Sequence, residues 1–190
     1  SGALSLSGRV TDRPHFLGPL LPGAIHIPAY YSMANGKPTD AAGREEAAKV
    51  SIEVLHQCFQ SEGEIAALFA EPIRSGPYLP PKWYWPKVRE LCTKYGVLLV
   101  SDEIPTGLGK TGRMFTSEVV DCVPDITLVG KALGGAMVPV AGVIISEDLD
   151  TTARLNLGYY TYERSPILAT AADTVLGILE EMNLPDAAQA

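Results

Sequence analysis

The chain has 190 residues, of which 46% are hydrophobic and 19% charged, and its formal net charge is −7. This length and composition are typical of one globular domain with a sizeable core, and an acidic chain without a dense run of Lys and Arg does not favour nucleic-acid binding. No apolar run approaches the roughly 20 residues of a membrane helix. The three cysteines are scattered and match no metal-site spacing. They argue against a disulfide framework, so we expect a reducing, cytoplasmic location.

The first long predicted element follows an irregular segment. Residues 9–39 carry prolines among glycines and aromatic residues, so we expect little regular structure there beyond a short strand at 24–28. The next segment, 40–60, is predicted to be a helix. Asp40 can accept free N–H groups at its start, and apolar residues between Val50 and Cys58 recur at the spacing of one helical face.

Short apolar runs then alternate with helical segments. The run at 65–70 is typical of a strand buried on both faces, as found in parallel sheets. The further expected elements are, in order, a helix opened by Pro80 and Pro81 and ended by Gly96, strands at 97–100, 125–129 and 140–145, and a helix at about 167–182. This alternation predicts the α/β class, with a doubly wound and mostly parallel sheet.

Three polar residues follow strands of this predicted sheet. They are Glu71, Asp102 and Lys131, and ligands of open α/β sheets bind beyond the carboxyl ends of the strands. The lysine stands between an apolar strand and the small residues of 132–135. In a tight apolar setting a lysine amine has a lowered pKa, which suits attack on a carbonyl group. Spacing alone leaves open the alternative of a solvated surface lysine.

Gly109-Lys110-Thr111 is similar to the end of a phosphate-binding P-loop. That motif needs a glycine five positions before Gly109, where this chain has Ile104, and it needs a helix directly afterwards. Gly112 follows instead. The P-loop interpretation is therefore rejected, and with it an ATPase interpretation of the strand at 98–103.

The chain resembles the class III aminotransferases, the ω-aminotransferase branch of the fold type I enzymes that use pyridoxal 5'-phosphate (PLP). The resemblance runs over nearly the whole sequence, and its most specific segments are Gly2 to Gly8, Ala70-Glu71-Pro72, Asp102 to Phe115 and Gly130 to Gly135. It implies that residues 1–155 are part of the large PLP-binding domain. Residues 156–190 would then be a connection and a helix leading toward a C-terminal small domain.

The resemblance also implies a role for four residues around the cofactor. Lys131 matches the Schiff-base lysine, whose freed amine then moves a proton at the substrate's α-carbon. Asp102 matches the partner of the pyridine nitrogen, and Ile104 matches a residue that packs on one face of the ring. Thr161 matches a threonine that reaches the cofactor phosphate of the neighbouring subunit, so the complete protein is expected to be a homodimer; a plain loop threonine is the alternative.

Two residues are candidates for substrate binding. Glu71 matches a family glutamate that pairs with a substrate-binding arginine, while a helix N-terminal acid is the alternative interpretation. Arg74 can help bind an anionic substrate group. Position 105 is proline where many relatives carry glutamine, and proline offers no hydrogen-bond donor there. The chain is similar here to a subgroup that includes ammonia-lyases of hydroxylated aminophosphonates. The shared features are Pro105, the segment Pro72 to Arg74 and the segment Tyr160 to Pro166.

Three functions remain open at this point. The first is transfer of an amino group from a small amine or amino acid to a keto acid. The second is release of ammonia from a hydroxylated aminophosphonate-type substrate. The third is a non-catalytic protein that retains the fold, against which the presence of both Asp102 and Lys131 argues. Because members of the family are longer than this chain, we expect the 190 residues to be inactive on their own.

Overall fold

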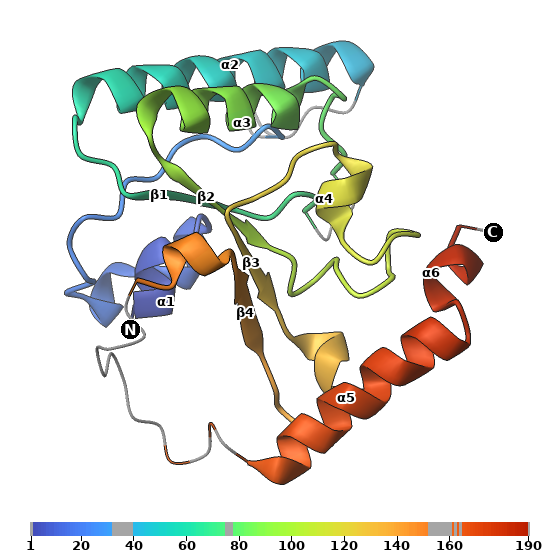
Figure 1. Cartoon of the computed structure of the whole chain (residues 1–190). Coiled ribbons are helices and arrows are strands. Elements are labelled where there is room, and N and C mark those ends of the chain that lie inside the picture. The colour runs from blue at the N-terminus through green and yellow to red at the C-terminus, as the bar shows by residue number, and fades with distance from the viewer. Residues whose placement is uncertain are drawn as a thin grey trace. The chain divides into compact units, whose positions relative to one another are not determined.

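The structure is a computed structural model that describes residues 2–31, 40–74, 78–151, 161, 163 and 165–189. It divides into two units: Ser1–Ile65 with Pro80–Lys87, and Ala66–Leu79 with Val88–Ala190 (Figure 1). The expected domain boundary between residues 155 and 156 lies outside the described residues and stays a prediction.

The first unit is built mainly from helices. It contains α1 (Gly2–Leu6), two 3₁₀ helices (Val10–Asp12 and His15–Leu17), α2 (Ala41–Ser61) and the first residues of α3 (Tyr84–Tyr95). The helix expected at 40–60 is confirmed as α2, and the carboxylate of Asp40 accepts the N–H of Gly43 at 2.7 Å. Pro80 and Pro81 do not open α3; they form the turn before it, in which the Pro81 carbonyl accepts the N–H of Tyr84 at 3.0 Å.

The strand expected at 24–28 is wrong, because these residues form no strand. A strand needs a neighbour that accepts and donates its backbone hydrogen bonds. The carbonyl of Pro28 instead accepts the hydroxyl of Ser51 at 2.7 Å, and that hydroxyl also bonds to the hydroxyl of Tyr84 at 2.9 Å. The segment is therefore held by side chains of α2 and α3.

An aromatic cluster forms the core of the first unit. The rings of Tyr30, Tyr84 and Trp85 meet edge to face, with centroids 5.1 to 6.3 Å apart, and all three side chains are buried. Burial raises the pKa of the Tyr84 hydroxyl to about 12. Tyr84 and Trp85 at the start of α3 therefore serve core packing.

The second unit holds a four-stranded sheet in the order β1-β2-β3-β4. Strands β1 (Ala67–Ala70), β2 (Leu98–Asp102) and β3 (Ile126–Val129) run parallel, and β4 (Gly142–Ile145) runs antiparallel to β3. The remaining helices are most of α3, α4 (Thr116–Val119), 3₁₀ helices at Lys131–Gly134 and Glu147–Leu149, α5 (Pro166–Glu181) and α6 (Leu184–Ala187). The predicted α/β class with a mostly parallel sheet is confirmed; the direction of β4 was not predicted.

The interior strands of this sheet are the best buried. Leu99 and Val100 of β2 are buried, as are Val88, Leu91 and Cys92 of α3. Gly96 follows the last residue of α3 and has a positive φ of 67°. A second cluster joins Leu108, Val129 and Leu133 to Leu179 of α5. The strand expected at 65–70 is confirmed as β1, but it is not buried on both faces, since Phe69 is 44% exposed. In the described sheet β1 is an edge strand with a single neighbour.

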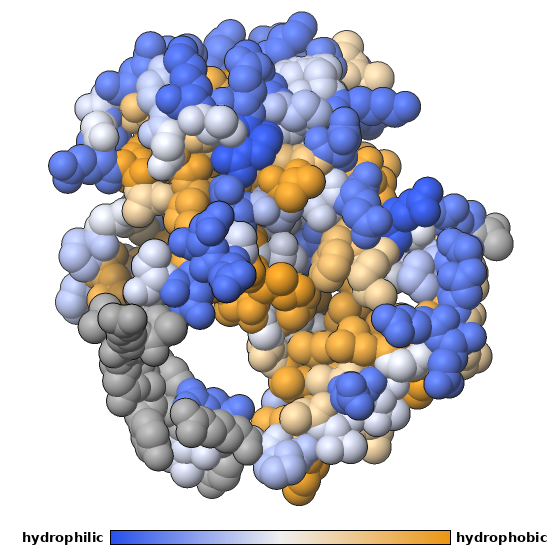
Figure 2. All heavy atoms as spheres, viewed as in Figure 1, coloured by the Kyte–Doolittle hydropathy of each residue, from blue (hydrophilic) through white to orange (hydrophobic). Residues whose placement is uncertain are grey.

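Apolar side chains also reach the surface at the other edge of the sheet. Val143, Ile144 and Ile145 of β4 are all exposed, so both faces of this strand are open in the described structure. Figure 2 shows apolar side chains on the visible surface of this part of the unit. Exposed apolar patches of this kind are typical of contact surfaces.

The two buried cysteines of the second unit should be unreactive. Burial raises the pKa of both Cys92 and Cys122 to about 11, so at pH 8 only about one thiol in a thousand is the nucleophilic thiolate. We expect iodoacetamide to label these positions at least about 100-fold more slowly in the folded complete protein than in denaturant, with the rate rising as the pH approaches 11. Peptide mass spectrometry at successive times measures both rates. Rapid labelling of the folded protein at pH 8 would contradict the burial.

Candidate functional site

The candidate site lies at the carboxyl edge of the parallel strands. Ala70 pairs with Ser101 and Asp102 pairs with Leu128, so the three strands end at nearly the same level. Glu71 follows β1, Asp102 ends β2, and Lys131 follows β3 after a single glycine. The parallel topology therefore brings the predicted residues to one edge, which is where open α/β sheets bind ligands.

Asp102 is held by the turn that follows it. Its Oδ1 atom accepts the backbone N–H of Ile104 at 3.1 Å, and its side chain is half-buried. Within the described part of the chain this is the one hydrogen bond recorded for the carboxylate, which leaves Oδ2 available to a ligand.

Ile104 connects the two sides of the site. The side chain of Ile104 lies against Gly130, whose Cβ position would be 3.5 Å from two of its carbon atoms. Gly130 immediately precedes Lys131, so the turn after Asp102 packs directly against the segment that carries the lysine. This contact brings an apolar side chain from the turn after Asp102 against the residue that precedes Lys131.

Lys131 begins the 3₁₀ helix Lys131–Gly134 in an unusual backbone conformation. Its φ is 45°, in the left-handed region that a residue with a Cβ rarely adopts, at a cost of about 1 kcal/mol or more. Lys131 is exposed, which agrees with the surface position that its spacing left open rather than with a tight apolar setting. The turn directs Leu133 and Gly134 into the core. Gly130 and Gly134, which flank residues 131–133, have no side chains that could cover the amine of Lys131.

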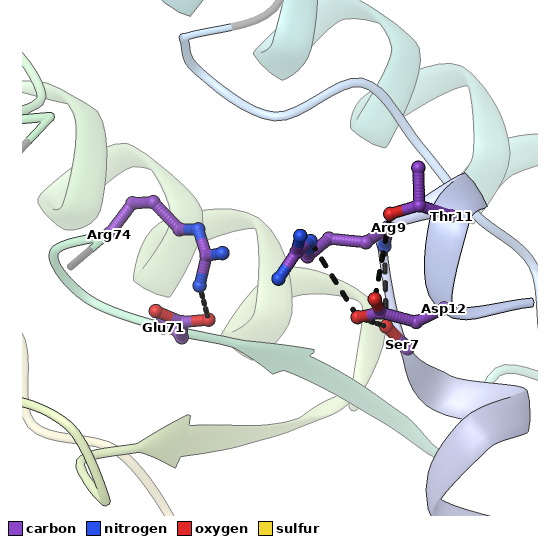
Figure 3. Close-up of polar contacts among 6 residues, drawn as sticks. All are labelled: Ser7, Arg9, Thr11, Asp12, Glu71 and Arg74. Atoms are coloured by element: carbon purple, nitrogen blue, oxygen red, sulfur yellow. Dashed lines mark hydrogen bonds and ion pairs between the residues drawn. The ribbon is translucent and has the colours of Figure 1, made fainter. Parts of the chain in front are cut away.

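Glu71 and Arg74 form an ion pair at the end of β1 (Figure 3). Arg74 Nη1 donates to Glu71 Oε1 at 2.6 Å, and the two side chains are 25% and 26% exposed. The second carboxylate oxygen of Glu71, Oε2, is buried with no hydrogen-bond partner in the described structure. Glu71 directly follows β1, and no described helix begins there, so its interpretation as a helix N-terminal acid is wrong. The two predicted substrate-binding residues therefore contact each other.

The remaining predicted positions are less fully defined. Thr161 is exposed in a turn, and its predicted role stays untested because residues 152–160, 162 and 164 lie outside the described residues. Tyr160, Tyr162 and Arg164 of the unusual segment fall in that gap. Pro105 lies in the turn after Ile104, and its carbonyl accepts the amine of Lys110 at 3.2 Å.

One residue of this region was missed by the sequence analysis. Glu103, between Asp102 and Ile104, is the one charged side chain that is buried among the described residues. Its carboxylate accepts the first N–H groups of α4. Phe115 could have indicated this role. It immediately precedes α4, where helices normally carry a side chain that accepts a hydrogen bond, and a phenylalanine side chain accepts none.

The described residues contain neither a metal-binding cluster nor a membrane-spanning helix. Among the described residues no cluster of histidine, cysteine and acidic side chains has the arrangement of a metal site. None of the described helices is both long and apolar enough to span a bilayer.

Comparison with known proteins places these features in context. The family described as "Aminotransferase class-III" matches residues 1–190. The curated protein (R)-1-hydroxy-2-aminoethylphosphonate ammonia-lyase of Vibrio splendidus is 35% identical over 200 residues, which cover 99% of this chain and 42% of that protein. The chain thus spans about two fifths of the length of this relative.

Solved structures agree in fold. The ω-transaminase of Pseudomonas jessenii in complex with PMP is 30% identical, with a TM-score of 0.83 over 97% of this chain and 43% of that one. An (S)-enantioselective ω-transaminase of Thermomicrobium roseum is 31% identical, with the same TM-score over 97% of this chain and 42% of that one. Both likenesses extend over nearly all of the chain.

Proposed function

The chain belongs to the class III aminotransferase family, and we propose that the complete protein is a PLP-dependent enzyme that transfers an amino group from a small amine or amino acid to a keto acid. The observation that supports this most is the shared carboxyl edge of β2 and β3, from which Asp102 and Lys131 extend. A purely structural role needs neither an acid with an available oxygen nor a lysine in a strained conformation at that edge.

The chemistry of the residues at this edge fits PLP. The cofactor has an aldehyde, a basic ring nitrogen and an apolar ring face. The exposed amine of Lys131 suits the aldehyde, the available Oδ2 of Asp102 suits the ring nitrogen, and the side chain of Ile104 suits the ring face. Thr161 is proposed to reach the cofactor phosphate in a neighbouring subunit, which makes a homodimer part of the proposal.

Asp102, Lys131 and Ile104 would have different roles in the reaction. When bound, PLP serves as an electron sink for the bond that breaks at the substrate's carbon. The carboxylate of Asp102 would hold a proton on the ring nitrogen through a charge-assisted hydrogen bond. The amine of Lys131, once released by the incoming substrate amine, would take a proton from the substrate's carbon and return it at the neighbouring position. Ile104 would exclude water from one face of the ring.

A second candidate reaction is elimination of ammonia. It is favoured by the likeness to a protein named as an aminophosphonate ammonia-lyase and by Pro105, which cannot donate a hydrogen bond beside the cofactor. The two reactions differ in whether a keto acid is needed. The test is to incubate the complete protein and PLP with small anionic amines, including hydroxylated aminophosphonates, with and without a keto acid. Amino transfer predicts a new amino acid only when the keto acid is present, whereas ammonia release without it would favour the lyase.

Arg74 is proposed to bind the anionic group of the substrate. Its side chain is a quarter exposed and is oriented by Glu71, and the planar fork of a guanidinium matches a carboxylate or phosphonate. We expect Arg74→Ala to raise KM for an anionic amine about tenfold or more, with a smaller change in kcat. A neutral amine of the same size should be used equally well by both proteins. Steady-state kinetics with the two amines measures this difference.

Arg89 provides the matched control. It also donates to a carboxylate at 2.6 Å with similar exposure, but its partner Asp125 precedes β3 and so lies at the opposite edge of the sheet. Arg89→Ala should lower the thermal stability and leave KM of the folded enzyme unchanged. Equal changes in KM for the anionic and neutral amines in Arg74→Ala would rule out the proposed contact.

A further inference from the structure

Glu103 lies between two residues assigned to the cofactor and is itself almost inaccessible. Its side chain is 1% exposed, and it is one of the largest fully buried side chains of the described structure. Burying a carboxylate is costly unless it is fully hydrogen-bonded. A charged group at such a position therefore requires a structural or functional explanation.

The carboxylate of Glu103 holds the start of α4. Oε2 accepts the N–H of Thr116 at 2.6 Å, and Oε1 accepts the N–H of Ser117 at 2.8 Å. These are the first two N–H groups of the helix, which have no partner within it. Phe115 has no side-chain acceptor, so Glu103 supplies the acceptors from the end of β2, thirteen residues earlier in the chain. Hydrogen bonds to an ionised acceptor are among the stronger ones in proteins.

The backbone of Glu103 is fixed as well. Its N–H donates to the carbonyl of Leu128 in β3 at 3.1 Å, and its own carbonyl accepts the N–H of Gly107 at 2.8 Å. Gly107 approaches so closely that an added Cβ would lie 3.0 Å from that carbonyl oxygen and 3.2 Å from the side-chain Oε2. Glu103 is therefore held on one side by β3 and on the other by the loop that leads to α4.

These contacts join the two halves of the site. Asp102 and Ile104 are the covalent neighbours of Glu103, while Leu128 lies on the strand that leads to Lys131. A shift of Glu103 would move the carboxylate on one side of it and the apolar group on the other relative to the lysine. Residues that orient binding groups commonly change affinity when they are altered, although they do not contact the ligand.

We propose that Glu103 is a positioning residue that sets the orientation of Asp102 and Ile104 toward the bound cofactor, a proposal that rests on the proposed function. It binds neither cofactor nor substrate itself. It acts by fixing the end of β2 between β3 and the start of α4.

The test compares Glu103→Gln with Glu118→Gln in the complete protein. Glu118 is an exposed residue of α4 that also accepts a backbone N–H, that of Phe115, at 2.8 Å, so it controls for loss of a helix-capping carboxylate. PLP is titrated into the apo-protein to obtain its dissociation constant, and visible circular dichroism reports the orientation of the bound cofactor. We expect Glu103→Gln to weaken PLP binding about tenfold or more and to change the dichroism per bound cofactor, with Glu118→Gln close to the unmodified protein.

A second variant keeps the carboxylate. The backbone of Gly107 does not require glycine, but a methyl group there would press on the carbonyl and side chain of Glu103. Gly107→Ala should therefore weaken PLP binding and alter the dichroism in the same direction as Glu103→Gln. It provides the test if Glu103→Gln does not fold.

The outcomes separate the two proposals. If the unmodified protein does not bind PLP, the proposed function fails. If it binds PLP, and the folded variants bind with the same dissociation constant and the same dichroism, Glu103 is only a stabilising residue and the inference is overturned, whatever the change in melting temperature.

Discussion

Replacing Lys131 with alanine in the complete protein is expected to lower turnover by about a thousandfold or more, because the same amine would hold the cofactor and move the proton at the substrate's carbon. The variant should also lose PLP on gel filtration under conditions in which the unmodified protein retains it. Kinetics with excess PLP and the visible absorbance of the filtered protein measure the two effects. A small added amine such as ethylamine should restore part of the turnover, since it supplies the missing base in solution.

Lys110 is the matched control for this experiment. It is exposed, and its amine donates to the carbonyl of Pro105 in the loop that follows the same sheet edge. Lys110→Ala removes an equal charge from the same region and should leave turnover within about twofold. Equal turnover in the Lys131 and Lys110 variants would remove the basis of the proposed function.

The backbone at Lys131 allows stability to be separated from chemistry. With a φ of 45° any residue bearing a Cβ is strained there, whereas glycine is not. Lys131→Gly should therefore be about 1 kcal/mol more stable than Lys131→Ala in the apo-protein, although both variants lose the amine. If both variants are inactive while their melting temperatures differ, the loss of activity is not a consequence of unfolding.

Local signals allowed most elements to be predicted to within a few residues. The cap formed by Asp40, the positive φ at Gly96 and the apolar runs of β2 and β3 each depend on a few neighbouring residues. The predicted strand at 24–28 failed because pairing requires a distant partner, and Pro28 bonds to a side chain instead. The direction of β4 likewise depends on a partner strand rather than on its own residues.

In the candidate site, too, some features follow from neighbouring residues and others depend on distant contacts. The order of strands and polar residues was sufficient to predict that Asp102 and Lys131 share a sheet edge, since parallel strands end together. Spacing left the exposure of Lys131 open, because the exposure depends on which way a short turn directs Leu133. Glu103 was missed because its partner helix begins thirteen residues later. Properties that arise from contacts across the sheet thus required the structure.

Replacing Asp102 with asparagine is expected to have the second largest effect, and it tests the other half of the site. Asparagine keeps the size of the side chain and can still accept the N–H of Ile104, so the turn should persist, but the negative charge is lost. We expect kcat/KM to fall about 100-fold or more, because a neutral amide does not hold a proton on the ring nitrogen. The matched control is Asp125→Asn. The carboxylate of Asp125 accepts hydrogen bonds from Arg89 and from the N–H of Leu99, both at 2.6 Å, and it lies away from the carboxyl edge of the sheet.

The control should lower the melting temperature and leave kcat/KM of the folded enzyme unchanged. A more specific test of the role of Asp102 uses a PLP analogue methylated on the ring nitrogen. This analogue carries a fixed positive charge and needs no proton there. It should recover part of the activity of Asp102→Asn relative to PLP, because the analogue supplies the charge that the lost carboxylate would have maintained. If Asp102→Asn retains full kcat/KM with PLP itself, the carboxylate does not face the ring nitrogen. The shared edge of β2 and β3 would then be a feature of the fold alone, since Lys131 without an opposing acid does not define how an aromatic cofactor is held.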